Sequence, residues 1–66
     1  MDLQPAPVTI TVVLSTTQAW ACAQFLKRVG LTTYLALAPH LDEAYEMLAA
    51  GEAIRAQLQR AGYAPR

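Results

Sequence analysis

The chain has 66 residues, no net formal charge at neutral pH and one cysteine. These totals exclude an intrachain disulfide and disfavour a DNA-binding protein that relies on a basic face to neutralise phosphates. A chain this short buries only ~60% of the surface that its unfolded form exposes, so we expect it to need association with another chain.

The hydrophobic fraction of 55% predicts a folded chain rather than a disordered one. No apolar run approaches the ~18 residues of a membrane span. The first five residues lack the basic and apolar regions of a signal peptide. We therefore expect a single small domain over residues 1–66, cytoplasmic and without a membrane partner.

The N-terminal quarter of the chain predicts one β-strand. Residues 1–7 contain two prolines and predict an extended lead-in, and residues 8–14 are rich in β-branched side chains that alternate between two faces. One face holds Val8, Ile10, Val12 and Leu14, and the other holds Thr9, Thr11 and Val13. A lone strand leaves its backbone groups unpaired, so this strand requires a partner.

Residues 16–29 carry the start and stop signals of a helix. Ser15 and Gln18 have the spacing of a capping box, and Lys27 and Arg28 fall in the last turn, where the helix dipole favours cations. Gly30 follows at the position that usually turns left-handed. The predicted apolar stripe is Ala19, Cys22, Phe25, Leu26 and Val29, with Ala23 at its edge.

Trp20 falls on the polar face of this helix, together with Gln24 and Lys27. Two interpretations follow: another part of the chain covers the indole, or the indole is an exposed anchor for a partner protein.

The connector over residues 31–40 fits two structures. Its LTTYLALAP sequence alternates like a strand that would pair with residues 8–14, and it also fits a short helix that ends before Pro39. We favour the short helix or a loop, because Gly30 alone separates the connector from the preceding helix. The strand over residues 8–14 would then pair between chains, through Val8, Ile10 and Val12.

A longer helix is predicted over residues 41–61, ended by Gly62. Its predicted apolar stripe is Ala44, Met47, Leu48, Ile54, Leu58 and Ala61. Gly51 lies at the centre of that stripe, which indicates either close approach of another backbone or a kink. A second row of Tyr45, Ala49, Ala53 and Ala56 predicts a further contact surface.

No catalytic, cofactor-binding or metal-binding motif is present, so we do not expect an enzyme. Cys22 is most simply a small buried hydrophobe and His40 a loop or capping residue, although the two together would be the elements of a nucleophile–base dyad. The carboxylates of Asp42, Glu43 and Glu46 match the dipole of a helix N-terminus, and a cation site is the alternative.

The alternating strand at 8–14 and the Ser15-capped helix after it resemble the ribbon-helix-helix family of dimeric repressors and antitoxins. In that family the strands of two chains pair antiparallel, and one strand face contacts the major groove. The resemblance implies DNA contacts by Thr9, Thr11, Lys27 and Arg28. This strand departs from the family in offering hydroxyls and Val13 where basic or amide side chains are usual.

The stretches AWACAQFLKRVG (19–30), EAYEM (43–47) and AGYAPR (61–66) resemble a family of short, uncharacterised proteobacterial proteins often carried on mobile elements. That resemblance implies a plasmid or phage context, in which small proteins often inhibit a host defence complex, as anti-CRISPR proteins do.

We therefore expect an α+β fold of one strand followed by two main helices, with the strand paired between chains. The expected function is a non-enzymatic protein–protein interaction module, a homodimer or part of a larger protein complex, with an inhibitor of host defence as one concrete form. Its partner-binding residues would be Trp20, Gln24, Lys27, Tyr45, Ala49 and Ala56. The alternative is the ribbon-helix-helix DNA-binding dimer.

Overall fold

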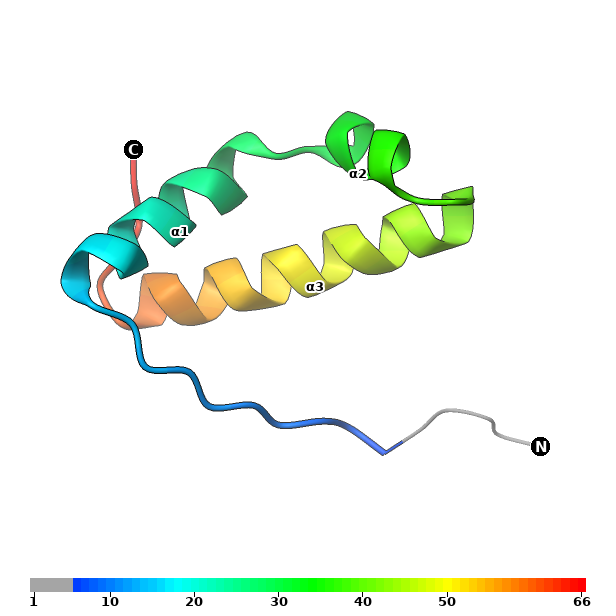
Figure 1. The fold of residues 1–66 in the computed structure, drawn as a ribbon. Helices are drawn as coiled ribbons and strands as arrows, with labels where there is room; N and C mark the ends of the chain where they lie inside the picture. The colour runs from blue at the N-terminus through cyan, green and yellow to red at the C-terminus, as the bar shows by residue number, and fades with distance from the viewer. Residues whose placement is uncertain (1–5) are drawn as a thin grey trace.

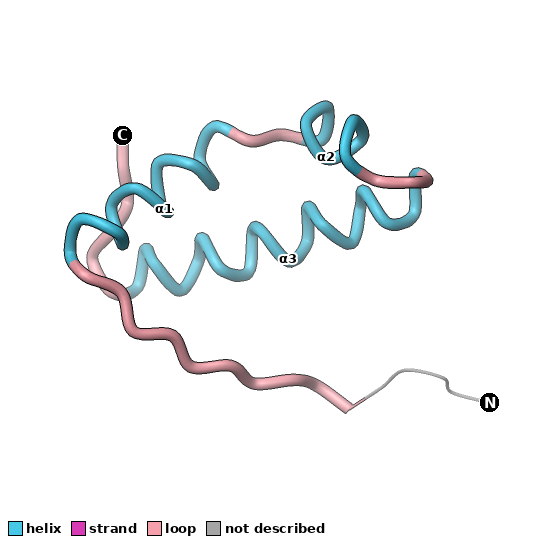
Figure 2. The backbone as a smooth tube through the Cα atoms, viewed as in Figure 1, coloured by secondary structure: helices cyan, strands magenta, loops and turns pink. Residues whose placement is uncertain are grey.

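The structure is a computed structural model that describes residues 6–66. Those residues contain three helices, α1 (Thr16–Arg28), α2 (Leu31–Leu37) and α3 (Leu41–Arg60). Helices α1 and α2 both pack on α3, one after the other along its length, and the residues before α1 run along the opposite side of α3 (Figure 1). The N-terminal arm, as we call residues 6–14, is drawn as a loop throughout in Figure 2.

The α+β prediction is therefore wrong, because residues 8–14 form no strand. The only other segment able to pair with them within the chain, residues 31–38, forms helix α2 for most of its length. A single extended segment has no neighbour for its backbone N–H and C=O groups, so its β-branched residues stay extended without entering a sheet. Of the predicted lead-in, residues 1–5 lie outside the described part of the chain.

Helix α1 begins with the predicted capping box. The Gln18 backbone N–H donates to Ser15 Oγ at 3.0 Å, and the Ser15 N–H donates to Gln18 Oε1 at 2.9 Å. Its end differs from the prediction, because Val29 is extended and Gly30, at φ −130°, is not left-handed. Gly30 instead caps the start of α2, so the chain passes from one helix to the next without reversing.

Helix α3 begins at His40, whose Nδ1 accepts a hydrogen bond from the Glu43 backbone N–H at 3.3 Å. It ends in a Schellman turn. The Tyr63 N–H donates to the Leu58 carbonyl at 2.8 Å, and Gly62 takes a φ of 100° that residues with a β-carbon avoid. This turn folds the C-terminal residues back toward α1.

The buried core is small and lacks large side chains. Its buried apolar residues are Ala19, Ala23, Leu26 and Ala44, together with Gly51. No large side chain among the described residues is fully buried. The predicted stripes are thus partly wrong: Ala23 is at the centre of the α1 interface, whereas Phe25 and Ile54, 59% and 47% exposed, lie outside the core. Ala61 is also exposed.

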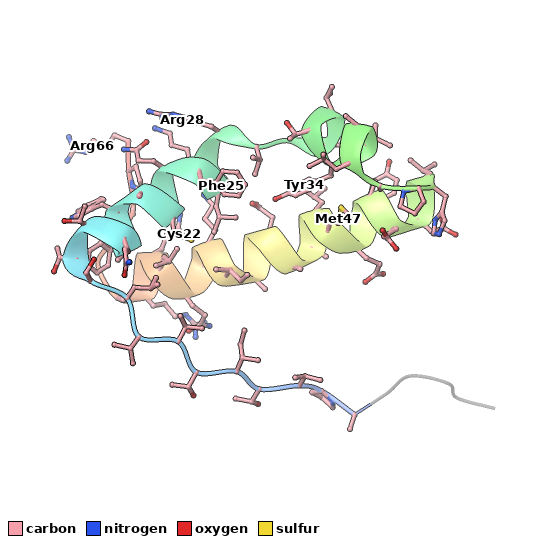
Figure 3. The ribbon with its side chains drawn as sticks, in the orientation of Figure 1. Cys22, Phe25, Arg28, Tyr34, Met47 and Arg66 are labelled. Atoms are coloured by element: carbon pink, nitrogen blue, oxygen red, sulfur yellow. The ribbon has the colours of Figure 1, made fainter. Side chains whose placement is uncertain are left out.

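Gly51 lies where α1, α2 and α3 come closest together. A β-carbon at Gly51 would overlap the Tyr34 hydroxyl of α2 and would lie 3.6 Å from Leu26 Cδ2 of α1. The predicted close approach is therefore made by side chains, not by another backbone. The absence of a side chain at Gly51 lets both helices rest on the same turn of α3. Tyr34 and Met47 lie between α2 and α3 in Figure 3.

The molecule is flat. Its principal extents are 41 × 28 × 16 Å. Stable domains generally pack at least two layers of secondary structure around a core. Here α1 and α2 form one layer and α3 forms the other, and the face of α3 that is turned away from α1 and α2 has only the N-terminal arm near it.

Candidate functional site

The N-terminal arm presents apolar side chains to solvent. Val8 and Val13 are 84% and 92% exposed, and Ile10, Val12 and Leu14 are exposed as well. Thr9 and Thr11 alternate with Val8, Ile10 and Val12, so one side of an extended arm is apolar and the other is mainly polar. Exposed β-branched apolar residues in a row are unusual on a soluble monomer, where such patches generally mark contact sites.

A groove separates the arm from α3. Its volume is about 610 Å³. It is lined by Val8, Thr9, Ile10, Ala50, Ala53, Ile54 and Gln57. Two of the three residues predicted to pair the strand, Val8 and Ile10, thus line a groove against α3. On α3, the sequence prediction named Ala53 in a further contact surface, but it placed Ile54 in the core and did not name Ala50 or Gln57.

Trp20 of α1 contacts Tyr63, which follows α3. The ring centroids are 5.0 Å apart and the ring planes meet at 68°, an edge-to-face arrangement. Trp20 nevertheless remains 42% exposed. Each sequence interpretation thus describes part of the indole: Tyr63 covers one portion of it, and the rest remains accessible. The Schellman turn at Gly62 is what brings Tyr63 back to this position.

The other predicted partner-binding residues lie on two separate surfaces. Gln24 and Lys27 of α1 are half-buried, whereas Tyr45, Ala49 and Ala56 of α3 are exposed. Gly51 faces α1 and α2, and helical spacing turns Ala49 and Ala56 well away from it. The fold therefore does not combine the α1 and α3 residues into one surface.

Charge is segregated along α3 although the chain is neutral. Asp42 and Glu43 lie in its first turn, Glu46 lies in the next, and Arg60 lies in its last turn. Glu52 makes a 3.7 Å ion pair with Arg55 near the middle. Helix α1 carries Lys27 and Arg28 in its last turn and no acid in its first. One end of α3 is thus acidic and its other end basic.

The residues considered for chemistry are not assembled into a catalytic site. Cys22 is half-buried on α1, which packs along the later part of α3, and His40 stands at the opposite end of α3 (Figures 1 and 3). The Nδ1 atom of His40 is engaged in the helix cap. Among residues 6–66, no group of three histidine, cysteine, aspartate or glutamate side chains is arranged to hold a metal ion.

The residues that the DNA-binding alternative would use also lie on separate parts of the structure. Thr9 and Thr11 lie on the arm, and Arg28 projects from α1 on the other side of α3 (Figure 3). Lys27 is half-buried beside it on α1. Residues 8–14, which the prediction made a strand, are not part of a strand among residues 6–66.

A family model matches residues 1–66, the whole chain, and its description is family of unknown function, DUF7706. The chain belongs to that family. The match supports the expected resemblance to an uncharacterised protein family and carries no activity with it. No curated protein and no solved structure matched the chain. Within the described residues, no helix combines the length and apolar character needed to cross a membrane.

Proposed function

We propose that this protein is a small protein-binding module whose function is to dock on another polypeptide through the N-terminal arm and the adjoining surface of α3. One observation carries the proposal: the large apolar side chains of this chain are mostly outside its core. The largest buried side chain is a leucine, whereas the arm and α3 expose Val8, Ile10, Val12, Val13, Leu14 and Ile54.

The energetics of burial support the proposal. Each Val, Leu or Ile side chain contributes about 1.5–3 kcal/mol when it is moved from water to an apolar environment. In the folded protomer these gains are only partly realised, because the side chains of the arm and of Ile54 remain between 40% and 92% exposed. A partner that covers the arm would provide them. The arm needs little rearrangement, since it is already extended.

A binding role also agrees with where the polar chemistry lies. His40 caps the start of α3. The Ser15 hydroxyl and the Gln18 side-chain amide together cap the start of α1. These groups have structural partners within their own turns. Ser15 and His40 are therefore engaged at helix ends, and Cys22 is half-buried on α1.

Site-specific photo-crosslinking in the native host tests the proposal. A benzophenone amino acid replaces Val13 or Ile54 in two variants, and Arg28, an exposed polar residue on the opposite side of α3, in a matched control. We expect protein adducts from the first two positions and few from the third. Absence of adducts from Val13 and Ile54, with the variants folded by circular dichroism, would overturn the proposal.

A mobility-shift assay distinguishes a nucleic-acid partner. Purified protein at ~50 mM salt should leave duplex DNA unshifted in a mobility assay, because the charge segregation leaves no continuous basic face. A duplex shift that falls steeply with salt and is lost in Arg28→Ala would favour the DNA-binding alternative over protein binding.

A further inference from the structure

We infer that the polypeptide docked on α3 is a second copy of this chain, with its α3 antiparallel to the first. This inference rests on the proposed function and names the partner. Three observations support it: the face of α3 that α1 and α2 leave uncovered, the charges at the two ends of that face, and the amount of surface that the protomer exposes to solvent.

The residues on the uncovered face of α3 recur with the spacing that is typical of a contact between two helices. Six exposed residues follow one another at alternating intervals of four and three positions: Asp42, Glu46, Ala49, Ala53, Ala56 and Arg60. A four-three alternation is the spacing that keeps one stripe facing a partner helix over its whole length. The groove beside this stripe, walled by the arm and Ile54, supplies apolar contacts at its edge.

The charges of the stripe specify the antiparallel orientation. Two copies of α3 related by a two-fold axis level with Gly51 overlap along the full helix. Residue 42 then lies opposite residue 60 of the second copy, and residue 49 opposite residue 53. Asp42 therefore meets Arg60 at both ends of the pair, and Glu46 is one turn away. A parallel arrangement would instead place acid against acid and arginine against arginine, which is repulsive.

The exposed surface matches the need of such a dimer. The accessible surface of the chain is 5482 Å², whereas a compact monomer of this mass exposes about 4100 Å². The radius of gyration of 13.6 Å likewise exceeds the roughly 11 Å of a compact domain of this length. The excess surface includes that of the extended arm, and it is larger than the about 800 Å² per partner that a standard interface buries.

Charge exchange tests the inference in the full-length protein by sedimentation velocity across micromolar concentrations. We expect wild type to be dimeric. Asp42→Arg and Arg60→Asp should each weaken the dimer about tenfold, because each removes two ion pairs per dimer and adds two repulsive contacts. An equimolar mixture of the two variants should form a heterodimer close to wild-type affinity, because the charges are then complementary at both ends.

Two controls match the position of each variant in its helix. Glu43→Arg reverses a carboxylate in the same first turn of α3 but off the stripe, and Arg28→Asp reverses a cation in the last turn of α1. Each control places an unfavourable charge at a helix end, as the matching stripe variant does, and should leave the affinity of the dimer unchanged. If a single stripe variant loses its helical circular dichroism, recovery of that signal on mixing with its complement supports the inference equally.

Three results would overturn the inference. The first is a helical wild type that sediments as a monomer. The second is a dimer whose affinity is unchanged by both charge reversals on the stripe. The third is a mixture of the two variants that dimerises no more tightly than either variant alone. A helical monomer that still yields heavier adducts from Val13 would leave the proposed protein-binding function intact with a different partner. Absence of adducts together with a monomer would remove both.

Discussion

The Tyr34 hydroxyl of α2 occupies the space that a β-carbon of residue 51 on α3 would take. Ordinarily, alanine in place of a mid-helix glycine stabilises the helix by about 1 kcal/mol. Here the added methyl displaces Tyr34, and overpacking of this kind costs roughly 1–3 kcal/mol. We therefore expect Gly51→Ala to lower the free energy of unfolding by about 1 kcal/mol in denaturant titration at fixed protein concentration.

The Tyr34→Phe background should reverse the sign of that effect. Without the hydroxyl, the nearest atoms to a β-carbon at residue 51 are Tyr34 Cζ at 3.4 Å and Leu26 Cδ2 at 3.6 Å, which are contact distances. Gly51→Ala should then stabilise by up to about 1 kcal/mol through helix propensity. Stabilisation by Gly51→Ala in the otherwise wild-type chain would show that Tyr34 does not pack on this turn.

The Ser15 capping box makes a local contribution to the stability of α1. Ser15→Ala removes the acceptor for the Gln18 N–H, and losses of this kind cost about 1 kcal/mol. Thermal unfolding followed by circular dichroism should show the decrease. Thr17→Ala, also exposed but inside the helix, is the matched control and should change stability by less than about 0.5 kcal/mol.

The Trp20–Tyr63 contact fastens the C-terminal residues to α1. A double-mutant cycle with Trp20→Phe and Tyr63→Ala should give a coupling of about 0.5–1.5 kcal/mol, the range for edge-to-face aromatic pairs. Trp20 is the only tryptophan, so its fluorescence reports on this site directly. Tyr63→Ala should shift its emission to longer wavelength as water reaches the uncovered edge. An unchanged spectrum and zero coupling would mean that the rings do not pack together.

The arm should affect partner binding much more than protomer stability. Val13 is 92% exposed, so Val13→Ser removes almost no buried area within the chain. We expect its helical signal and unfolding free energy to stay within about 0.5 kcal/mol of wild type, while adduct formation from Ile54 falls. A large loss of stability would instead place Val13 in the protomer's own core. Thr11→Ser, on the same arm, is the control.

Local signals in the sequence determined the helices. Helix α1 spans Thr16–Arg28 where the prediction had 16–29, and α3 spans Leu41–Arg60 where the prediction had 41–61. The Ser15 capping box and the turn at Gly62 are each completed by residues within a few positions of one another. Interactions of such short range depend little on the rest of the fold, so they can be predicted from the sequence alone.

Tertiary structure decided what each element faces. The alternation of residues 8–14 was a correct sign of extended backbone, but a strand also needs a neighbour, and α2 removed the only one in the chain. Likewise, periodicity defined an apolar side of α1 without revealing that Ala23 would be buried and Phe25 exposed, because burial depends on how the helices pack together around Gly51. Sequence by itself determined that α1 and α3 are helical, since their capping and termination are local, whereas it left the segment that forms α2 open between a strand and a short helix. Which apolar residues are buried depended on long-range packing, and that packing left the arm and the outer face of α3 open.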